Sequence, residues 1–218
     1  MELWTMWTHL LEVALGSLAL HFGVSEAIGI IVFTLIARTA LMPLSLTAAY
    51  KAQKNKDAVN RLKPALDELR KNYKDQPSEL ASRTMALYRE HGVSFIDKVT
   101  LLNVGSQIIF GLGIFQTLKR MAFNSKFLWI ASLAKPDFIL TVVVGALMLL
   151  GMTLMPGASA DTSMLLMLAI PVIISVIAIA ALPSALGIYW ATSNAFTIVQ
   201  TLALRGLMAR HRRLSAIA

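Results

Sequence analysis

The sequence predicts an all-α polytopic membrane protein, with five transmembrane helices, an interfacial N-terminal helix and a cytoplasmic helical hairpin. Of the 218 residues, 56% are apolar and only 15% are charged, whereas ordinary soluble domains carry about 25% charged residues. Uncharged runs recur at close to the roughly 20 residues that cross about 30 Å of hydrocarbon. The chain has no Cys, which excludes a disulfide scaffold and thiolate metal sites. The composition also excludes a soluble enzyme and a disordered chain.

Residues 1–22 are predicted to form an amphipathic helix that lies in the membrane interface. Its polar residues His9 and Glu12 fall outside an apolar stripe, and Trp is typical of headgroup depth. A cleaved signal peptide is the alternative, but a basic n-region is missing from this segment. The stripe has spacings of three and four residues: Trp4, Trp7, Leu11, Ala14 and Leu18.

Five later segments are predicted to cross the membrane as helices. In lipid each backbone polar group needs an internal partner, so apolar runs of this length must be helical. Pro183 and Ser184 make a tight break before the last span. The predicted spans are 23–49, 99–118, 138–155, 163–182 and 185–204.

The distribution of basic residues predicts the orientation of these spans. Eleven of the 20 Lys and Arg lie in segment 50–98, four in the tail 205–218 and four in the connection 119–137. An odd number of spans puts segment 50–98 and the tail on the same side. The positive-inside rule makes that side cytoplasmic. We therefore expect an extracytoplasmic N-terminus, an extracytoplasmic connection 119–137 and a basic cytoplasmic tail.

Segment 50–98 is predicted to form a basic helical hairpin. The residues Lys74 to Pro77 suit a turn, Ser78 could cap the second helix, and Gly92 suits its end. Pro64 should kink the first helix or mark its true start. The coiled-coil seam of the first helix has spacings of 3, 4, 3 and 4: Val59, Leu62, Leu66, Leu69 and Tyr73.

Arg38 is the candidate functional residue, because we interpret it as the one charge inside the five spans, without an acidic partner. A central Arg costs about 2.5–3.5 kcal/mol on insertion scales, so it should reach water, backbone carbonyls or neutral polar groups. Polar stripes on the first, second and last spans could line a hydrated groove around it. Alternatively, these groups only join helices, or Arg38 extends to an interface about 15 Å away. The stripe residues are Thr34, Ser45, Asn103, Ser106, Gln107, either Ser193 or Asn194, Thr197, Gln200 and Thr201.

Several motifs together resemble the YidC/Oxa/Alb family of membrane insertases. In Thr34–Leu44 an Arg precedes a Pro-Leu pair, as in the family's first core span, and a basic hairpin follows. The resemblance covers residues 23–205. This chain departs from the family between Ser94 and Gln107. The family shows an Asn-Pro pair and a Gln-Pro pair in this region, and both prolines are missing here. The large extracytoplasmic domain of many Gram-negative members is also missing. The other matching motifs are Leu62–Leu66, Lys71–Lys74, Met85–Val93, Phe127–Trp129, Lys135–Asp137, Leu186–Asn194 and Gln200.

The resemblance implies a divergent, minimal insertase and chaperone of the bacterial plasma (inner) membrane, not an enzyme. Its substrate groove would centre on Arg38 and include Trp190 beside the stripe residues. It would accept hydrophilic segments of nascent membrane proteins and release their apolar spans into the lipid bilayer. The implied partners are the ribosome, the signal recognition particle with its receptor, and the Sec translocon. We expect no cofactor, no metal and no specific DNA binding.

Three alternatives to an insertase remain open at this stage. A small transporter or channel subunit normally needs carboxylates or His within its spans, or inverted repeats. A membrane enzyme needs a catalytic His, paired acids or a Ser-base pair. A non-catalytic assembly scaffold would need only the hairpin.

Overall fold

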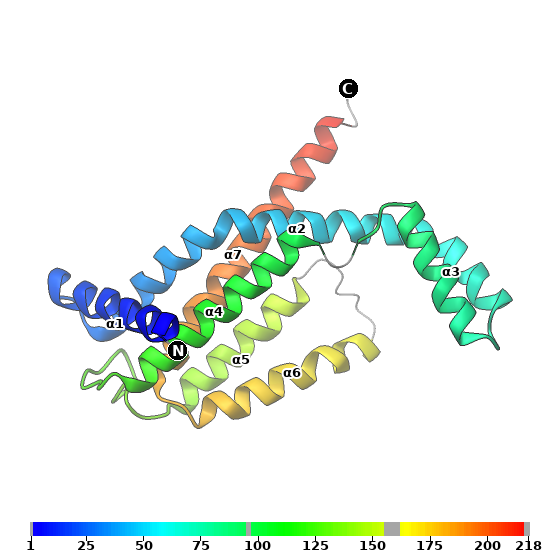
Figure 1. The fold of residues 1–218 in the computed structure, drawn as a ribbon. Helices are drawn as coiled ribbons and strands as arrows, with labels where there is room; N and C mark the ends of the chain where they lie inside the picture. Colours follow the sequence, from blue (N-terminus) through cyan, green and yellow to red (C-terminus); the bar gives the residue numbers. More distant parts are fainter. Residues whose placement is uncertain (1, 95–96, 155–161, 216–218) are drawn as a thin grey trace. The chain divides into compact units, whose positions relative to one another are not determined.

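A computed structural model describes residues 2–94, 97–154 and 162–215 of the chain (Figure 1). These residues form helices without a strand, which confirms the predicted all-α class. Met155, the predicted connection 156–162 apart from Thr162, and the last residues 216–218 of the predicted tail lie outside the described ranges. The helices are α1 (Glu2–Phe22), α2 (Glu26–Asn72), α3 (Pro77–Glu90), α4 (Lys98–Arg120), α5 (Phe138–Thr153), α6 (Thr162–Ala180) and α7 (Ser184–Ser215).

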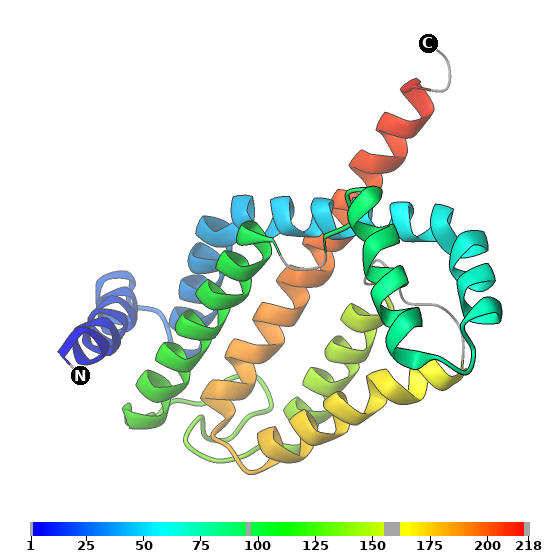
Figure 2. The same ribbon diagram turned by 45° about the vertical axis from the view of Figure 1, so that its right-hand side comes forward.

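The chain divides into two compact units. The core unit comprises Met1–Pro43 and Gly105–Ala218, and the two-helix unit comprises Leu44–Val104. Within the core unit, α5 packs against both α6 and α7 (Figures 1 and 2). A Cβ on Gly187 of α7 would come within 2.5 Å of Leu140 Cδ2 of α5. Glycine at this position leaves room for the Leu140 side chain, which would have to shift if position 187 carried a Cβ.

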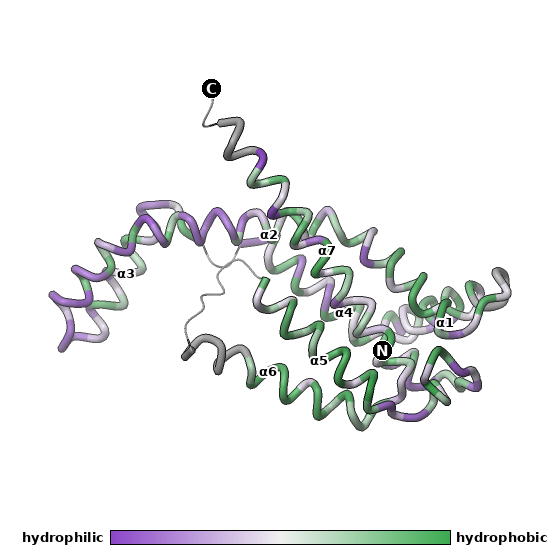
Figure 3. The backbone as a smooth tube through the Cα atoms, turned by 180° about the vertical axis from the view of Figure 1, so that it is seen from behind, coloured by the Kyte–Doolittle hydropathy of each residue, from purple (hydrophilic) through white to green (hydrophobic). Residues whose placement is uncertain are grey.

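Several helices have the character of membrane spans. By length and composition, α2 and α4 could each cross a membrane, and α5 and Ala169–Ala180 of α6 are shorter apolar helices. The polar stripe of α7 lowers its hydropathy, although its 32 residues are long enough. Figure 3 shows that the described parts of α5 and α6 are mostly apolar, whereas α3 is largely hydrophilic. Five spans therefore remain a prediction, while the apolar helices fit an integral membrane protein.

The exposed surface of α6 supports a lipid environment. Ile170, Ile173, Ile174 and Ile177 are each more than half exposed. Four large apolar side chains on one short helix would be unfavourable in water and are typical of a lipid-facing surface.

Helix α1 packs its stripe against α4. Leu11 and Leu15 are buried, and the Trp4 indole donates to Gln116 Oε1 at 2.8 Å. The Thr117 hydroxyl of α4 donates to the Thr8 carbonyl at 3.2 Å. The helix also exposes a second apolar face. An interfacial position remains a prediction, and the residues of this second face are Leu3, Met6, Leu10 and Val13.

Two local expectations can be compared with the structure. Helix α2 continues without interruption through residues 49 and 50, so Pro64 lies inside it and does not mark its start, and the expected kink at Pro64 stays a prediction. A central Pro costs one backbone hydrogen bond, which a long helix with tertiary contacts tolerates. The prediction that Ser78 caps α3 was wrong, because Gln76 is the N-cap and Pro77 takes the first turn. Pro is well suited there, since its missing N–H would have no helical partner.

Segment 119–137 is irregular but firmly held. Phe123, Ile130 and Leu133 are buried. The Ser184 N–H and hydroxyl at the start of α7 donate to the Lys135 carbonyl at 3.0 and 2.6 Å. Asp137 accepts from the Leu140 N–H at 2.7 Å and so caps α5. These contacts close one end of the core unit around α5 and α7.

Candidate functional site

The Arg38 guanidinium joins three helices of the core unit. Nη1 of Arg38, on α2, donates to Gln107 Oε1, on α4, at 2.7 Å. Nη2 donates to the hydroxyl of Ser193, on α7. The structure therefore brings together one residue from each of the three predicted polar stripes. Both partners are neutral, and each accepts a hydrogen bond from a permanently charged donor.

Tyr189 extends this network and was missing from the predicted site. Its hydroxyl hydrogen bonds with Ser193, which lies one helical turn further along α7. Both side chains are buried, at 6% and 2% exposure. Their four-residue spacing on a helix was the available sequence signal, since such residues share a face. Tyr189 thus orients the hydroxyl that accepts from Arg38.

The bonds of Arg38 leave part of its donor capacity unused. A guanidinium has five N–H donors, and the two hydrogen bonds above use two of them. Arg38 Nε is buried and has no hydrogen-bond partner among the described residues. A buried donor without a partner costs about 1–3 kcal/mol. The site therefore favours an added acceptor, such as water or a carboxylate.

The interpretation of Arg38 as the one charge in the spans needs a correction. Glu26 lies within the predicted span 23–49 and is the first residue of α2. It is 12 residues from Arg38, about 18 Å at the helical rise. Its carboxylate accepts from the Ser125 hydroxyl at 2.7 Å and from the N–H groups of Asn124 and Ser125 at 3.2 Å. Glu26 therefore holds segment 119–137 and is not a partner of Arg38.

Three other predicted residues bond to their own helices. The Thr34 hydroxyl donates to the Ile30 carbonyl at 2.6 Å, and the Thr197 hydroxyl to the Ser193 carbonyl at 3.0 Å. The Asn194 amide donates to the Trp190 carbonyl at 2.8 Å. Such local bonds are common for short polar side chains. Of the two alternatives on α7, Ser193 is the one that contacts Arg38.

The remaining predicted residues contribute to the surroundings. Trp190 is half-buried, and its ring lies 6.4 Å from that of Tyr189. Ser106 and Gln200 are half-buried on α4 and α7. Asn103 lies on α4 in the part that belongs to the two-helix unit.

The chemistry of the site suits an anion and not a cation. Arg38 supplies a fixed positive charge, and its neighbours supply an amide and two hydroxyls. No group of three His, Asp or Glu side chains that could hold a metal lies within the described part of the chain. An anionic or strongly polar segment is therefore the natural ligand for this geometry.

Comparison with known proteins gives a consistent result. The family described as 60Kd inner membrane protein matches residues 18–211. Membrane protein insertase YidC 1 of Listeria monocytogenes serotype 4b is 34% identical over 208 residues, covering 90% of this chain and 70% of that protein. Membrane protein insertase YidC of Clostridium tetani is 28% identical, covering 86% of this chain and 84% of that protein. The Helicobacter pylori protein of the same name (strain 26695) is 27% identical over 86% of this chain, which spans 34% of its length.

Proposed function

The chain belongs to the YidC/Oxa/Alb family of membrane protein insertases, and from this premise we propose how it handles its substrates. It is an integral membrane insertase of the bacterial inner membrane, not an enzyme. Its substrates are nascent membrane proteins, which it transfers into the lipid bilayer. The proposal concerns the mechanism of this transfer.

In our proposal, Arg38, Gln107 and Ser193 form the centre of a hydrated groove. Trp190, Thr197, Gln200 and the other stripe residues line its length. The groove takes in the hydrophilic segment of a substrate, while the apolar span of the substrate moves into lipid. A partly hydrated path lowers the cost of carrying polar groups through hydrocarbon, which is several kcal/mol for an unsatisfied group.

The observation that carries the proposal is that both hydrogen-bond partners of Arg38 are uncharged. Its partners are an amide and a hydroxyl, so the positive charge is oriented but not neutralised. A carboxylate in the substrate can then form a charge-assisted, bidentate pair with the guanidinium. A pre-existing acidic partner would have blocked that contact.

The free energy for insertion comes from the substrate and the membrane. Burying an apolar span in lipid is strongly favourable, at about 0.8 kcal/mol per buried CH₂. The membrane potential adds about 2.3 kcal/mol per charge per 100 mV. These sources make nucleotide hydrolysis unnecessary for each transfer.

The topology in this proposal has five spans, which comprise the first part of α2, then α4, α5, α6 and α7. Segment 50–98 and the basic tail lie on the cytoplasmic side, the N-terminus lies outside, and α1 lies in the interface. Segment 50–98, which lies within the two-helix unit, is the cytoplasmic hairpin that receives the substrate from the ribosome, the signal recognition particle and its receptor, or the Sec translocon. The eleven basic residues in segment 50–98 support this orientation.

Reconstitution tests the proposal directly. The purified chain is placed alone in liposomes and given a single-span substrate with an extracytoplasmic acidic N-terminal tail. We expect protease-protected insertion above that of protein-free liposomes. Insertion no better than in the protein-free liposomes, or a solute flux in place of insertion, would contradict the proposed function.

A further inference from the structure

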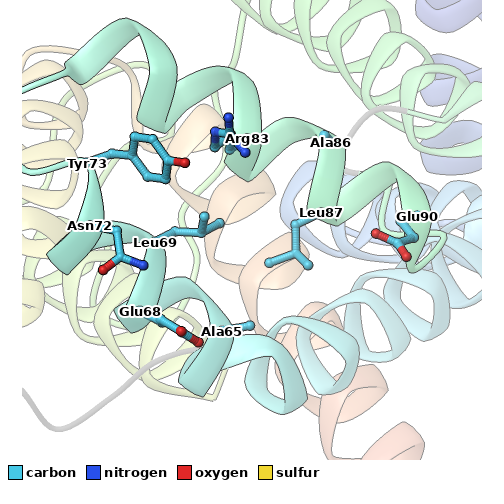
Figure 4. A pocket seen from close by; sticks show the side chains of 9 residues that line it. All are labelled: Ala65, Glu68, Leu69, Asn72, Tyr73, Arg83, Ala86, Leu87 and Glu90. Atoms are coloured by element: carbon cyan, nitrogen blue, oxygen red, sulfur yellow. The ribbon is translucent and has the colours of Figure 1, made fainter.

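The two-helix unit contains a cavity of about 390 Å³ between its arms. Figure 4 shows Leu69 of α2 and Leu87 of α3 pointing toward each other across it. Both leucines are half-buried, so the floor of the cavity is apolar and accessible. Cavities that bind small ligands or side chains in proteins begin at about 300 Å³. The full lining is Ala65, Glu68, Leu69, Asn72, Tyr73, Arg83, Ala86, Leu87 and Glu90.

The cavity lies where the seam between the two arms stops being tightly packed. Leu62 and Leu66 are buried, together with Val93. Further along α2, Leu69 and Tyr73 line the cavity instead. The predicted seam of five residues therefore closes at one end and stays open at the other. An open apolar seam between two helices is a place where another side chain can insert.

The charge at the cavity is opposite to that of the chain. Glu68 and Glu90 contribute two carboxylates that form no ion pair within the described residues. The one basic lining residue, Arg83, is already engaged: its Nε donates to Glu79 Oε1 at 2.8 Å, and its guanidinium lies 4.6 Å from the centre of the Tyr73 ring. The lining is thus net negative in a chain of net charge +8. A cationic ligand is matched to it, and an anionic one is not.

We propose that this cavity binds a basic residue flanked by apolar residues in the cytoplasmic part of a nascent membrane protein. The proposal rests on the insertase function above, and it gives the second unit a ligand of its own. Membrane proteins carry Lys and Arg beside their spans on the cytoplasmic side. Such a flank offers a cation for Glu68 and Glu90 and an apolar side chain for Leu69 and Leu87. The hairpin would hold the end of the substrate that stays inside, while the Arg38 groove handles the end that crosses.

Peptide binding to the full chain in phosphatidylcholine nanodiscs tests this proposal. The uncharged lipid avoids attraction of the probe to the membrane. The probe is a fluorescein-labelled peptide, Ala-Leu-Arg-Leu-Lys-Ala, and the control peptide has Glu in place of both basic residues. We expect the basic peptide to bind, with an affinity that falls as salt is added, and the acidic peptide not to bind.

Matched variants locate the binding. Glu68→Gln with Glu90→Gln should weaken binding about three- to ten-fold, the loss of two partly exposed charge contacts. Asp67→Asn with Asp75→Asn changes the net charge of the two-helix unit equally, at exposed positions on α2 and in the turn before α3 that lie outside the cavity, and should leave the affinity unchanged. Leu87→Ala should also weaken binding, because it removes part of the apolar floor.

Several results would overturn the assignment. Equal losses in both double variants would mean that general surface charge attracts the peptide. Binding that appears only after removal of residues 206–218 would assign the cavity to the chain's own basic tail. Peptide binding does not require insertion, so these failures are distinct from a failure of insertion in liposomes.

Discussion

Segment 119–137 and the two-helix unit are both connections between apolar helices, yet segment 119–137 is held by more buried contacts, because the two-helix unit has only a small buried cluster of Leu62, Leu66 and Val93. In segment 119–137, Leu133 is fully buried and Ile130 is 2% exposed, and Glu26 receives three hydrogen bonds. In the two-helix unit α3 has no buried residue, and the two ion pairs on its arms, Arg70–Asp67 and Arg83–Glu79, are largely exposed.

This difference leads us to expect that the two connections differ in how readily their conformation changes while a substrate is inserted. Buried apolar contacts and satisfied buried polar groups keep a segment closed, whereas exposed ion pairs contribute little to stability. Segment 119–137 therefore acts as a fixed end of the core unit. We expect the open end of the seam in the two-helix unit to separate at lower cost, which would suit the substrate-receiving role proposed above.

Of the changes that compare these two connections, removal of the hairpin should give the largest effect on function. Deleting residues 55–90 and closing the gap with a Gly-Ser linker should lower the initial insertion rate about ten-fold, the loss of ~1.4 kcal/mol of docking free energy. The core unit should still assemble, because its contacts lie within Met1–Pro43 and Gly105–Ala218. Insertion rate in proteoliposomes and helix content by circular dichroism are the measurements. Full insertion without the hairpin would contradict the proposed docking role of the hairpin.

Truncation of one leucine in each region should destabilise the protein by different amounts. Leu133→Ala should reduce the free energy of unfolding by about 2–5 kcal/mol, since the residue is fully buried. Leu69→Ala, at a half-buried position in the two-helix unit, should cost less than half as much. Unfolding by sodium dodecyl sulfate, followed by Trp fluorescence, measures both. Equal losses would contradict the contrast between a fixed and a mobile connection.

The carboxylate of Glu26 offers a smaller and more local test. Glu26→Gln keeps the side-chain size but replaces a charged acceptor of three hydrogen bonds, so it should cost about 1–3 kcal/mol. Faster hydrogen exchange at the Asn124 and Ser125 amides is the expected sign. Glu12→Gln on the exposed side of α1 serves as the control. Unchanged exchange at both amides would show that Glu26 does not hold the segment.

The smallest effect is expected at Asp97, at the base of the hairpin. Its carboxylate accepts from the Thr100 N–H at 3.0 Å and the Val99 N–H at 2.7 Å, and it pairs with Lys51 at 3.4 Å. The backbone donors, Thr100 foremost, and Lys51 lower the pKa of this carboxyl below its ordinary value. A lowered pKa contributes stability above the ordinary pKa of Asp, and acidification through the lowered pKa removes it.

Exchange protection at the Val99 and Thr100 amides measures this cap. Protection should be constant at neutral pH and fall only in strong acid. Asp97→Asn should show reduced protection at neutral pH and no acid-dependent step. An acid step that persists in Asp97→Asn would mean that another group controls the start of α4.

Much of this organisation follows from the sequence, and the exceptions have physical reasons. The all-α class and the Arg38–Gln107–Ser193 grouping follow from hydropathy and helical spacing, because polar groups in an apolar helix must find one another. Helical spacing alone did not distinguish stripe residues that bond to a neighbouring helix from those that bond to their own helix, such as Thr34 and Thr197. That choice depends on rotamers and local distances.

The firm structure of segment 119–137 was not predictable by periodicity. It has no regular repeat, and its closure depends on tertiary contacts from Glu26, Ser184 and Asp137. Leu128 even adopts a positive φ of 50°, which propensity alone would not place at a leucine. The open end of the hairpin seam was likewise hidden, since Leu69 and Tyr73 continue the heptad pattern without closing it.

The most direct test of the central claim is the dependence of insertion on substrate charge at Arg38. Paired substrates that differ only in an acidic or a neutral tail are inserted by wild type, Arg38→Lys and Arg38→Gln. We expect Arg38→Lys to insert both nearly as well as wild type, because it keeps the charge and loses only the planar fork. Arg38→Gln should insert the neutral tail normally and the acidic tail about ten-fold less or worse, since hydrogen bonds to charged groups contribute ~1.5–3 kcal/mol. Equal loss for both tails in Arg38→Gln would show that Arg38 shapes the groove and does not recruit the charge of the substrate.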